Sequence, residues 1–347
     1  MIAANKAALL EPTVAEQTLP SFRGIPAVIA SPAMRRVMEF TGKIAPSNAA
    51  VLVTGESGCG KEVVARSIHE RSLRAGKPWV DLNCAALPDH LLESELFGFE
   101  KGAFSGAETA KPGMFELAHQ GTLFLDEIGE LSMRSQSKLL RVLDGCPYYR
   151  LGGTRKIEVS ARIIAATNAD LETAVQEGRF RADLFFRLNQ VRVTVPPLRE
   201  RKEEIAPLCR LFLSQERPGL RISEDALAVL RCYHWPGNVR ELKSLMARLA
   251  VLFDGEEIRR EDLPPEMQAV SCEMPAVETH SLNRLEQEVI FHALEQAAGR
   301  RDRAAAMLGI SRRTLIRRLK LYGVSPSHGR TCGAPPAALS ITGGSGY

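Results

Sequence analysis

The sequence predicts an α/β domain with a parallel sheet, then an all-helical region, then a small helical module near the C-terminus. Short apolar segments alternate with helical ones, and strands buried on both faces of a parallel sheet read as such continuous apolar runs. After the segment PPLRER (196–201) the pattern is helical to about Leu263, and helices start again near Leu282. A chain of 347 residues can form two or three domains with substantial cores.

Five segments are predicted as the strands of the sheet, because each is short, apolar and bounded by turn residues. The predicted strands are residues 49–55 (AAVLVTG), 79–84 (WVDLNC), 121–127 (GTLFLDE), 162–168 (RIIAATN) and 191–196 (VRVTVP).

Composition excludes several classes of protein. No apolar run approaches the roughly 18 residues that a membrane span needs, and the N-terminus does not read as a signal peptide. The seven cysteines form no CxxC pair, so we expect reduced thiols and a cytoplasmic location. Residues 284–325 hold nine Lys and Arg against four Asp and Glu, which favours nucleic-acid binding there, although a solvated helical face would look similar.

A glycine-rich segment, GESGCGKE (55–62), follows the first strand and opens a helix. This context predicts a phosphate-binding loop (P-loop), in which backbone N–H groups and the helix N-terminus surround the phosphates of ATP. Lys61 is expected to reach the β and γ phosphates. The predicted nucleotide-binding residues of the loop are Gly55, Glu56, Ser57, Gly58, Cys59, Gly60, Lys61 and Glu62.

Two carboxylates end the strand GTLFLDE, about 65 residues after Lys61. Asp126 can hold Mg²⁺, and Glu127 can polarise a water molecule for attack on the γ-phosphate. Thr167 and Asn168 end a later strand. Because parallel strands end at the same edge of a sheet, we expect them to line the same ligand site.

Eight motifs, in their order along the chain, closely resemble the sigma-54-dependent transcriptional activators, which are bacterial enhancer-binding AAA+ ATPases. The resemblance implies an AAA+ fold with a helical lid, a ring of subunits (expected to be a homo-hexamer), and remodelling of sigma-54 RNA polymerase holoenzyme bound at promoters. The motifs are GESGCGKE, NCAAL, ELFGFEKGAFSGA, GTLFLDEIGEL, AATN, FRADLFFRLN, PPLRER and WPGNVREL.

The resemblance assigns roles to further polar residues. Asn83 matches an asparagine that restrains the water-activating glutamate. Arg181 and Arg187 match arginines that a neighbouring subunit inserts into the ATP site, and Arg240 matches a lid arginine that senses the γ-phosphate. Members of the family can also have a glutamate directly after the P-loop lysine, and Glu62 occupies that position here.

A loop with paired glycines, GAFSGA, fits neither a helix nor a strand period. In the family this loop projects from the ring and contacts sigma-54, with the phenylalanine as the contact wedge. Ser105 replaces the usual threonine, which keeps the hydroxyl and loses a methyl group. The predicted contact residues are Gly102, Ala103, Phe104, Ser105, Gly106 and Ala107.

The sequence of the C-terminal module predicts a helix-turn-helix. An apolar stripe (Leu285, Val289, Ile290, Ala293, Leu294) precedes two short helices, and Ser311 is placed to cap the second of these. The module resembles the Fis-type domains of the same activators. The predicted DNA-binding residues are Ser311, Arg312, Arg313, Thr314 and Arg317.

We therefore predict an activator that binds upstream enhancer DNA, with no membrane contact. The expected boundaries leave no room for an N-terminal regulatory domain, so control would come from a partner protein, from expression level or not at all. A repressor with a non-remodelling ATPase, or another AAA+ machine, is the alternative. The expected segments are an extension (1–24), an α/β subdomain (25–197), a lid (198–265), a linker (266–283), the helix-turn-helix (284–325) and a disordered tail (326–347).

Overall fold

The computed structural model describes residues 20–268, 290, 293–294, 297 and 300–321. The chain divides into two compact units, residues 1–272 and 273–347. Among the described residues, no helix is both long enough and apolar enough to cross a membrane.

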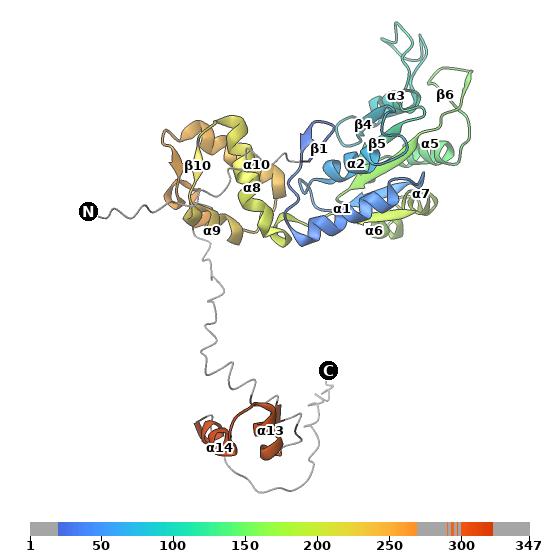
Figure 1. Ribbon diagram of the computed structural model, residues 1–347. Helices are drawn as coiled ribbons and strands as arrows, with labels where there is room; N and C mark the ends of the chain where they lie inside the picture. Colours follow the sequence, from blue (N-terminus) through green and yellow to red (C-terminus); the bar gives the residue numbers. More distant parts are fainter. Residues whose placement is uncertain (1–19, 269–289, 291–292, 295–296, 298–299, 322–347) are drawn as a thin grey trace, which may run out of the picture. The chain divides into compact units, whose positions relative to one another are not determined.

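A parallel five-stranded sheet forms the centre of the first unit, in the order β4-β5-β8-β3-β9 (Figure 1). Each of the five segments predicted as strands contributes one strand, so the predicted α/β fold is confirmed. The strands are β3 (Val51–Thr54), β4 (Trp79–Asn83), β5 (Thr122–Asp126), β8 (Arg162–Thr167) and β9 (Val191–Thr194).

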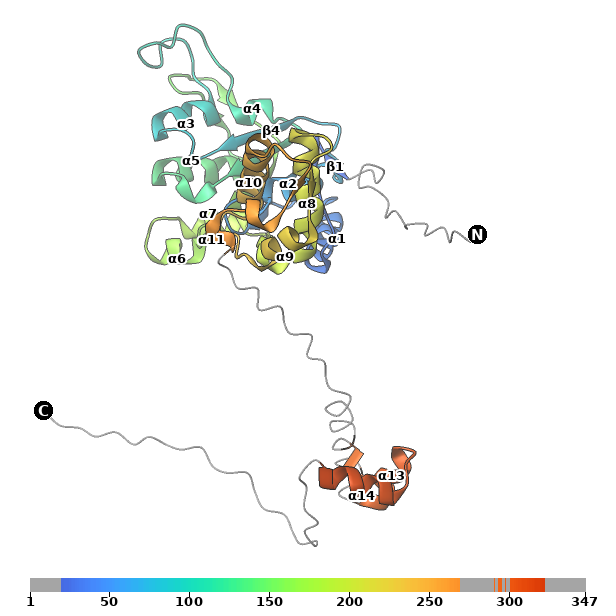
Figure 2. The same cartoon turned by 90° about the vertical axis from the view of Figure 1, so that its left-hand side faces the viewer.

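Helices cover both faces of this sheet, because alternate strand residues point to opposite faces. In β3, Val51 and Val53 belong to the core beneath α1 and α2, whereas Leu52 belongs to the core beneath α3 to α7. Figure 2 shows α3, α5 and α7 on one side and α1 and α2 on the other. These helices are α1 (Pro32–Ile44), α2 (Lys61–Glu70), α3 (Asp89–Phe97), α4 (Met114–Leu117), α5 (Met133–Leu143), α6 (Leu171–Gln176) and α7 (Ala182–Leu188).

The parallel arrangement brings the carboxyl ends of the strands to one edge of the sheet. Thr54, Asn83, Asp126 and Thr167 end four strands, and the register pairs Asn83 with Asp126 and Thr54 with Thr167. Side chains from four distant parts of the sequence therefore meet at this edge, as expected for ligand sites in open α/β sheets.

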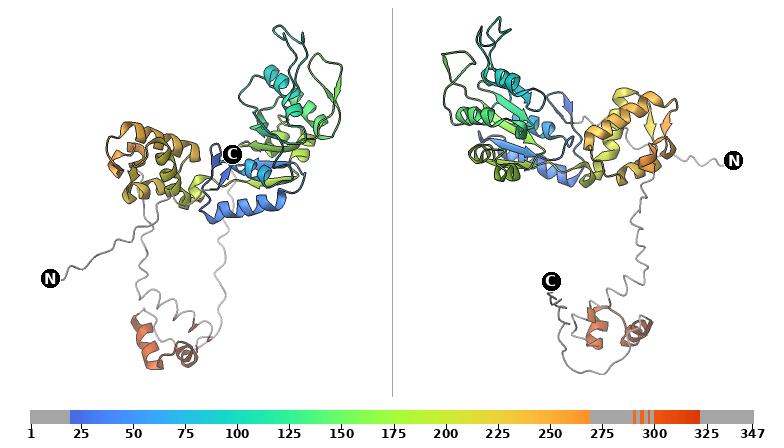
Figure 3. Two further views of the ribbon diagram at one scale, coloured as in Figure 1. Left: turned by 45° about the horizontal axis from the view of Figure 1, so that its top comes forward. Right: turned by 180° about the vertical axis from the view of Figure 1, so that it is seen from behind.

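The lid is a helical layer around the buried Trp235 and Leu242 (Figure 3). The prediction that this region is wholly helical is wrong, because two short strands, β10 and β11, pair in parallel between its helices. The helix α11 overlaps the start of the segment expected to be a linker (266–283), and its Met267 is buried in the lid core. Residues 269–283 of that segment lie outside the described residues. The lid elements are α8 (Ile205–Glu216), β10 (Arg221–Ile222), α9 (Glu224–Cys232), α10 (Asn238–Leu252), β11 (Glu257–Ile258) and α11 (Pro265–Gln268).

Shorter elements complete the first unit. They are the hairpins β1 (Ser21–Phe22) with β2 (Ile25–Pro26) and β6 (Tyr148–Tyr149) with β7 (Lys156–Ile157), and the 3-10 turns η2 (Ile128–Glu130), η3 (Leu198–Glu200), η4 (Lys202–Glu204) and η5 (Arg260–Asp262). The expectation of reduced thiols holds for the free Cys59, Cys84, Cys146 and Cys209 and is wrong for Cys232, which is disulfide-bonded.

Over residues 300–321, the structure describes the helices α13 (Arg301–Met307) and α14 (Arg312–Leu321), as the helix-turn-helix prediction requires. Buried Ala304 and Ala305 let the helices approach, and Leu315 and Leu319 fill the small core between them. Of the predicted stripe that precedes them, Ile290 and Ala293 are buried and Leu294 packs against this core. Leu285, Val289 and the tail lie outside the described residues.

Candidate active site

The P-loop connects β3 to α2 in a conformation that depends on its glycines. Gly58 and Gly60 have φ angles of +72° and +97°, in the region that favours glycine, and Gly60 is the N-cap residue directly before α2. At Gly55, a Cβ atom would lie 2.8 Å from the carbonyl oxygen of Val195. The three glycines thus give a tight turn that leaves backbone N–H groups at the helix N-terminus available for an anion.

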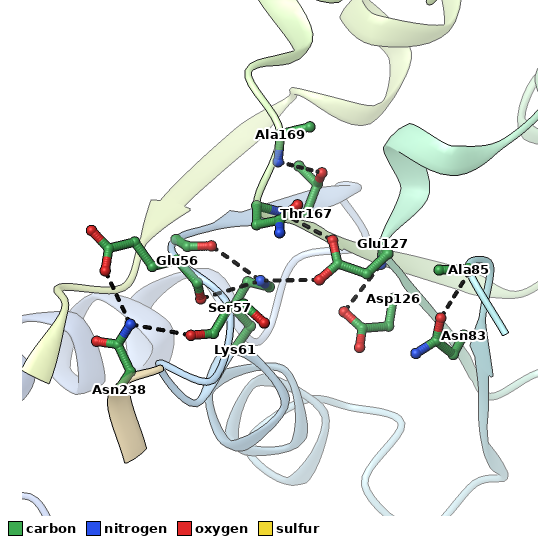
Figure 4. Close-up of polar contacts among 12 residues, drawn as sticks. Glu56, Ser57, Lys61, Asn83, Ala85, Asp126, Glu127, Thr167, Ala169 and Asn238 are labelled. Atoms are coloured by element: carbon green, nitrogen blue, oxygen red, sulfur yellow. Dashed lines mark hydrogen bonds and ion pairs between the residues drawn. The ribbon is translucent and has the colours of Figure 1, made fainter. Parts of the chain in front are cut away.

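Lys61 follows this turn as the first residue of α2 and is only 6% exposed. Its Nζ donates to the carbonyl oxygens of Gly55 (3.0 Å) and Glu56 (3.4 Å) and lies 3.5 Å from Oε1 of Glu127 (Figure 4). The ammonium group therefore stands between the P-loop and the acidic end of β5, as expected for a phosphate-binding lysine.

Asp126 and Glu127 lie at the end of β5, beside the P-loop. Glu127 has a φ of +51°, and its Oε2 accepts a hydrogen bond from the backbone N–H of Asn168 (3.2 Å). Burial raises the pKa of the Asp126 carboxyl, and the charge of Glu127 raises it further. Carboxylate oxygens are ligands that Mg²⁺ prefers, whereas Lys61 and the N–H groups at the start of α2 supply positive potential for phosphates, so these residues fit Mg²⁺ together with ATP.

The remaining predicted residues of this edge are held by local contacts. Thr167 is buried, and its Oγ1 accepts from the N–H of Ala169 (3.0 Å). The side chain of Asn83 points toward Ala85, and its Oδ1 accepts a hydrogen bond from the backbone N–H of Ala85 (2.9 Å). Within the described part of the chain no hydrogen bond joins Asn83 to Glu127, so the predicted restraint is not formed in this conformation (Figure 4).

The lid contacts the P-loop through the start of α10. Arg240 Nη1 donates to Oγ of Ser57 (2.8 Å), and Val239 N–H donates to the carbonyl oxygen of Gly58 (3.0 Å). A Cβ atom on Gly58 would lie 2.5 Å from the carbonyl oxygen of Gly237, so only glycine allows this approach. The structure thus brings Arg240 to the P-loop.

Sequence reasoning missed a clasp, which we define as Glu56, Arg199 and Asn238. Arg199 donates to both carboxylate oxygens of Glu56 (2.6 and 2.9 Å), and Asn238 Nδ2 donates to one of them (3.0 Å). These hydrogen bonds, that of Arg199 first, lower the pKa of Glu56 to about 2. Arg199 and Asn238 lie in the recognised motifs PPLRER and WPGNVREL, so the motifs were the available signal.

A second, buried group of contacts connects the P-loop to η4 and to the start of α1. Arg201 donates to the carbonyl oxygen of Cys59 and pairs with Glu204 at 3.1 Å. Glu204 in turn accepts from the backbone N–H (3.2 Å) and hydroxyl (2.8 Å) of Ser31 at the start of α1. Burial raises the pKa of the Cys59 thiol, which fits a small side chain filling space rather than a reactive thiolate.

Arg181 and Arg187 lie at the two ends of α7. Arg181 pairs with Asp183 (2.7 Å) and donates to Ser137 (3.2 Å), whereas Arg187 donates to the carbonyl oxygen of Leu143 (2.8 Å). Figure 1 shows α7 at the end of the α/β subdomain remote from the lid. No hydrogen bond or ion pair described for either arginine reaches the P-loop of the same chain.

The predicted contact loop projects beyond α3 (Figures 1 and 3). Gly102 and Gly106 have φ angles of +82° and +101°, and Gly102 N–H donates to the carbonyl oxygen of Ala107 (2.9 Å), which closes the loop. Phe104 is 44% exposed and touches Phe99 at the loop base, with ring centroids 4.9 Å apart. Of the other loop residues, Ser105 is exposed, Ala103 is half-buried and Ala107 is buried.

The helix α14 presents a basic surface. Arg312, Arg313 and Arg317 are exposed, and Thr314 is half-buried. Ser311 caps the helix as predicted, because its Oγ accepts from the N–H of Thr314 (3.1 Å). Arg312 also pairs with Asp302 (3.1 Å), so Arg313 and Arg317, one helical turn apart, form the part of this surface with no described ion pair.

Three family models match consecutive parts of the chain. A sigma-54 interaction domain matches residues 27–194, an AAA+ ATPase lid domain matches residues 199–279, and a Fis-family bacterial regulatory protein matches residues 281–322.

Several known proteins, each longer than the part that matches, are similar over most of this chain. Regulatory protein AtoC of Escherichia coli (strain K12) is 48% identical over 86% of this chain and 68% of its own length. A Nif-specific regulatory protein of Azotobacter vinelandii is 44% identical over 85% of this chain and 58% of its own. The crystal structure of NtrX from Brucella abortus in complex with ATP is 37% identical, with a TM-score of 0.64 over 86% of this chain and 69% of that one.

These similarities extend over the sheet, the lid and the helix-turn-helix alike. The fold is therefore that of an AAA+ P-loop ATPase with a lid and a Fis-type domain, as predicted. Because the motifs, the domain order and the relatives agree, the chain belongs to the family of sigma-54-dependent AAA+ transcriptional regulators.

Proposed function

We propose that this protein activates transcription by hydrolysing ATP, in a ring of identical subunits, to remodel closed complexes of sigma-54 RNA polymerase. The observation that carries the proposal is the projecting loop with its exposed Phe104, on the same subdomain that holds the P-loop. An apolar ring exposed on a loop costs solvation and adds nothing to the core, which is typical of a surface that binds a partner.

Each polar group at the sheet edge has a distinct proposed role in hydrolysis. Lys61 binds the β and γ phosphates of ATP, with the N–H groups of the loop. Glu127 orients and polarises the attacking water, since its carboxylate lies at the edge of the sheet and is held by Lys61 and Asn168. Asn83 would restrain Glu127 after its amide turns away from Ala85.

Asp126 would hold Mg²⁺, whose positive charge offsets the charge that develops on the phosphates during transfer. Arg240 would contact the same phosphates, and its hydrogen bond to Ser57 of the P-loop supports this role. Thr167 and Asn168 support this edge from β8.

We propose that Arg181 and Arg187 act on the ATP of a neighbouring subunit, because neither contacts the P-loop of its own chain. Mixing a Lys61→Ala subunit with an Arg187→Ala subunit should then restore part of the ATP turnover. Some interfaces in a mixed ring pair an intact P-loop with an intact arginine, whose contribution can reach several powers of ten in rate.

Phosphate release is measured for each variant alone and for the mixture, with mixed rings verified by sizing. The matched control mixes Lys61→Ala with the Arg192→Ala variant, which lacks an exposed arginine on β9 and should be active by itself. Mixed rings of the two inactive variants that show no recovered turnover would contradict a shared site.

In vitro transcription with sigma-54 holoenzyme on a supercoiled template tests the proposed function. ATP-dependent appearance of transcripts is the expected result. Sequence-specific DNA binding with ATP turnover but no transcript would instead favour the alternative, a repressor of the same architecture.

The exposed arginines of α14 are expected to read the upstream enhancer DNA through the major groove. Arg313→Ala should weaken binding to the specific site by about 10- to 100-fold, because a bidentate contact with guanine contributes roughly 1–3 kcal/mol. Footprint titration at fixed salt measures the loss, with Ser311 and Thr314 left in place as the cap. ATP turnover serves as the control and should not change, and an unchanged footprint would place the base contacts elsewhere.

A further inference from the structure

Glu56 is an acidic side chain inside a loop that must receive the anionic phosphates of ATP. A free carboxylate there would oppose the positive potential of the helix N-terminus and loop N–H groups. Arg199 removes this conflict, because its two terminal nitrogens lie 2.9 and 2.6 Å from the two carboxylate oxygens. Such a two-point pair fixes orientation as well as charge.

Asn238 connects this pair to the lid. Its side chain is fully buried and makes three hydrogen bonds: Nδ2 donates to Glu56 (3.0 Å) and to the carbonyl oxygen of Ser57 (3.1 Å), and Oδ1 accepts from Leu198 N–H (2.7 Å). Its φ angle of +54° is unusual for a residue other than glycine. Backbone strain of this kind persists where surrounding contacts hold it, as they do here.

The clasp therefore joins three separate parts of the chain at one carboxylate. Glu56 comes from the P-loop, Arg199 from the η3 turn that leads out of the sheet, and Asn238 from the first turn of α10. Two residues beyond Asn238, Arg240 reaches Ser57. The clasp and the Arg240–Ser57 contact thus join the same turn of α10 to the P-loop.

We propose that Glu56 is a positioning residue that holds the lid against the P-loop, and so places Arg240 for hydrolysis, through its contacts with Arg199 and Asn238. This inference rests on the proposed ATPase function. It assigns to one P-loop carboxylate two actions, which are to neutralise Arg199 beside the phosphates and to fix the start of α10.

The Glu56→Gln variant tests the proposal, because glutamine keeps the size of the side chain and an oxygen for Asn238 but loses the charge that pairs with Arg199. Turnover at saturating ATP should fall about tenfold, since Arg240 is no longer held in place. KM for ATP should not rise, because the released guanidinium of Arg199 adds a cation near the phosphates. Hydrogen exchange should be faster at the amide of Val239, which is bonded to Gly58.

Two comparisons separate this role from a general loss of stability. Glu172→Gln breaks a similarly exposed arginine pair, Glu172 with Arg192 (2.8 Å), away from the P-loop, and should leave turnover within about twofold. The double variant Glu56→Gln/Arg199→Gln should turn over no more slowly than Glu56→Gln alone, because both changes break the same contact.

Turnover of Glu56→Gln within twofold of the parent chain would overturn the inference, as would slower turnover of the double variant than of Glu56→Gln alone. The Lys61→Ala variant keeps this outcome distinct from failure of the proposed function. If Lys61→Ala loses ATP binding while Glu56→Gln behaves as the parent, the ATPase assignment stands and the clasp has no part in positioning.

Discussion

Replacing Lys61 by alanine is expected to abolish ATP binding, whereas Glu127→Ala should bind ATP and fail to hydrolyse it. Lys61 is the buried cation of the P-loop, and its Nζ already spans the loop carbonyls and Glu127. Its loss leaves the phosphates without their main charge partner. Glu127 faces the same space with a carboxylate that can polarise water, so its loss removes hydrolysis and spares binding.

Nucleotide affinity and phosphate release are measured for both variants in the same preparation. We expect Glu127→Ala to lose at least about 100-fold in turnover, a typical contribution for a positioned general base. The control is Glu130→Ala, which removes the carboxylate three residues after Glu127, at the end of η2. Its nucleotide affinity and phosphate release should stay close to those of the parent chain. Undiminished turnover in Glu127→Ala would refute its assignment.

Replacing Phe104 by alanine is expected to abolish transcription activation while ATP turnover continues. The ring is 44% exposed on a projecting loop closed by Gly102 and Ala107, and its only described ring contact is with Phe99 at the loop base. Truncation therefore removes a large apolar contact surface from the proposed wedge without opening a cavity in the sheet core.

Phe40→Ala is the matched control, since Phe40 is 41% exposed on α1 and lies outside the loop. It should keep both transcription and turnover. Ser105→Thr restores the threonine usual in the family and should leave activation equal to or above that of the parent chain. Transcript yield and phosphate release, measured together, decide the matter: if Phe104→Ala activates normally, the wedge lies elsewhere.

Local sequence patterns were sufficient to predict the fold class and to nominate the main groups of the candidate site. The P-loop, the Asp126–Glu127 pair and the glycine-bracketed loop are each contiguous, so spacing and residue type are sufficient to recognise them. Parallel strands then bring Asp126 and Thr167 to the edge that holds Lys61, which follows from alternating strands and helices without any knowledge of side-chain contacts. The basic helix α14 could be predicted in the same way, because its cap and its arginines lie within the short segment 311–317.

The smaller elements β10, β11 and α11 could not be predicted from local sequence patterns. The β10–β11 pair has only two residues in each strand, too few for a periodic pattern, and α11 lies in a proline-rich stretch that reads as a linker. The burial of Met267 stabilises α11, and burial by a distant core leaves no local signal.

Which side chains contact one another could be known only from the folded chain. Glu56 is 143 residues from Arg199 and 182 from Asn238, so no local pattern links the members of the clasp. The side chain of Asn83 also adopts one of several possible rotamers, the one directed toward Ala85, and a sequence motif does not specify a rotamer. Motifs fix the identity of the groups that do chemistry, whereas their contacts depend on backbone path and packing between segments far apart in sequence, which only the folded chain brings together.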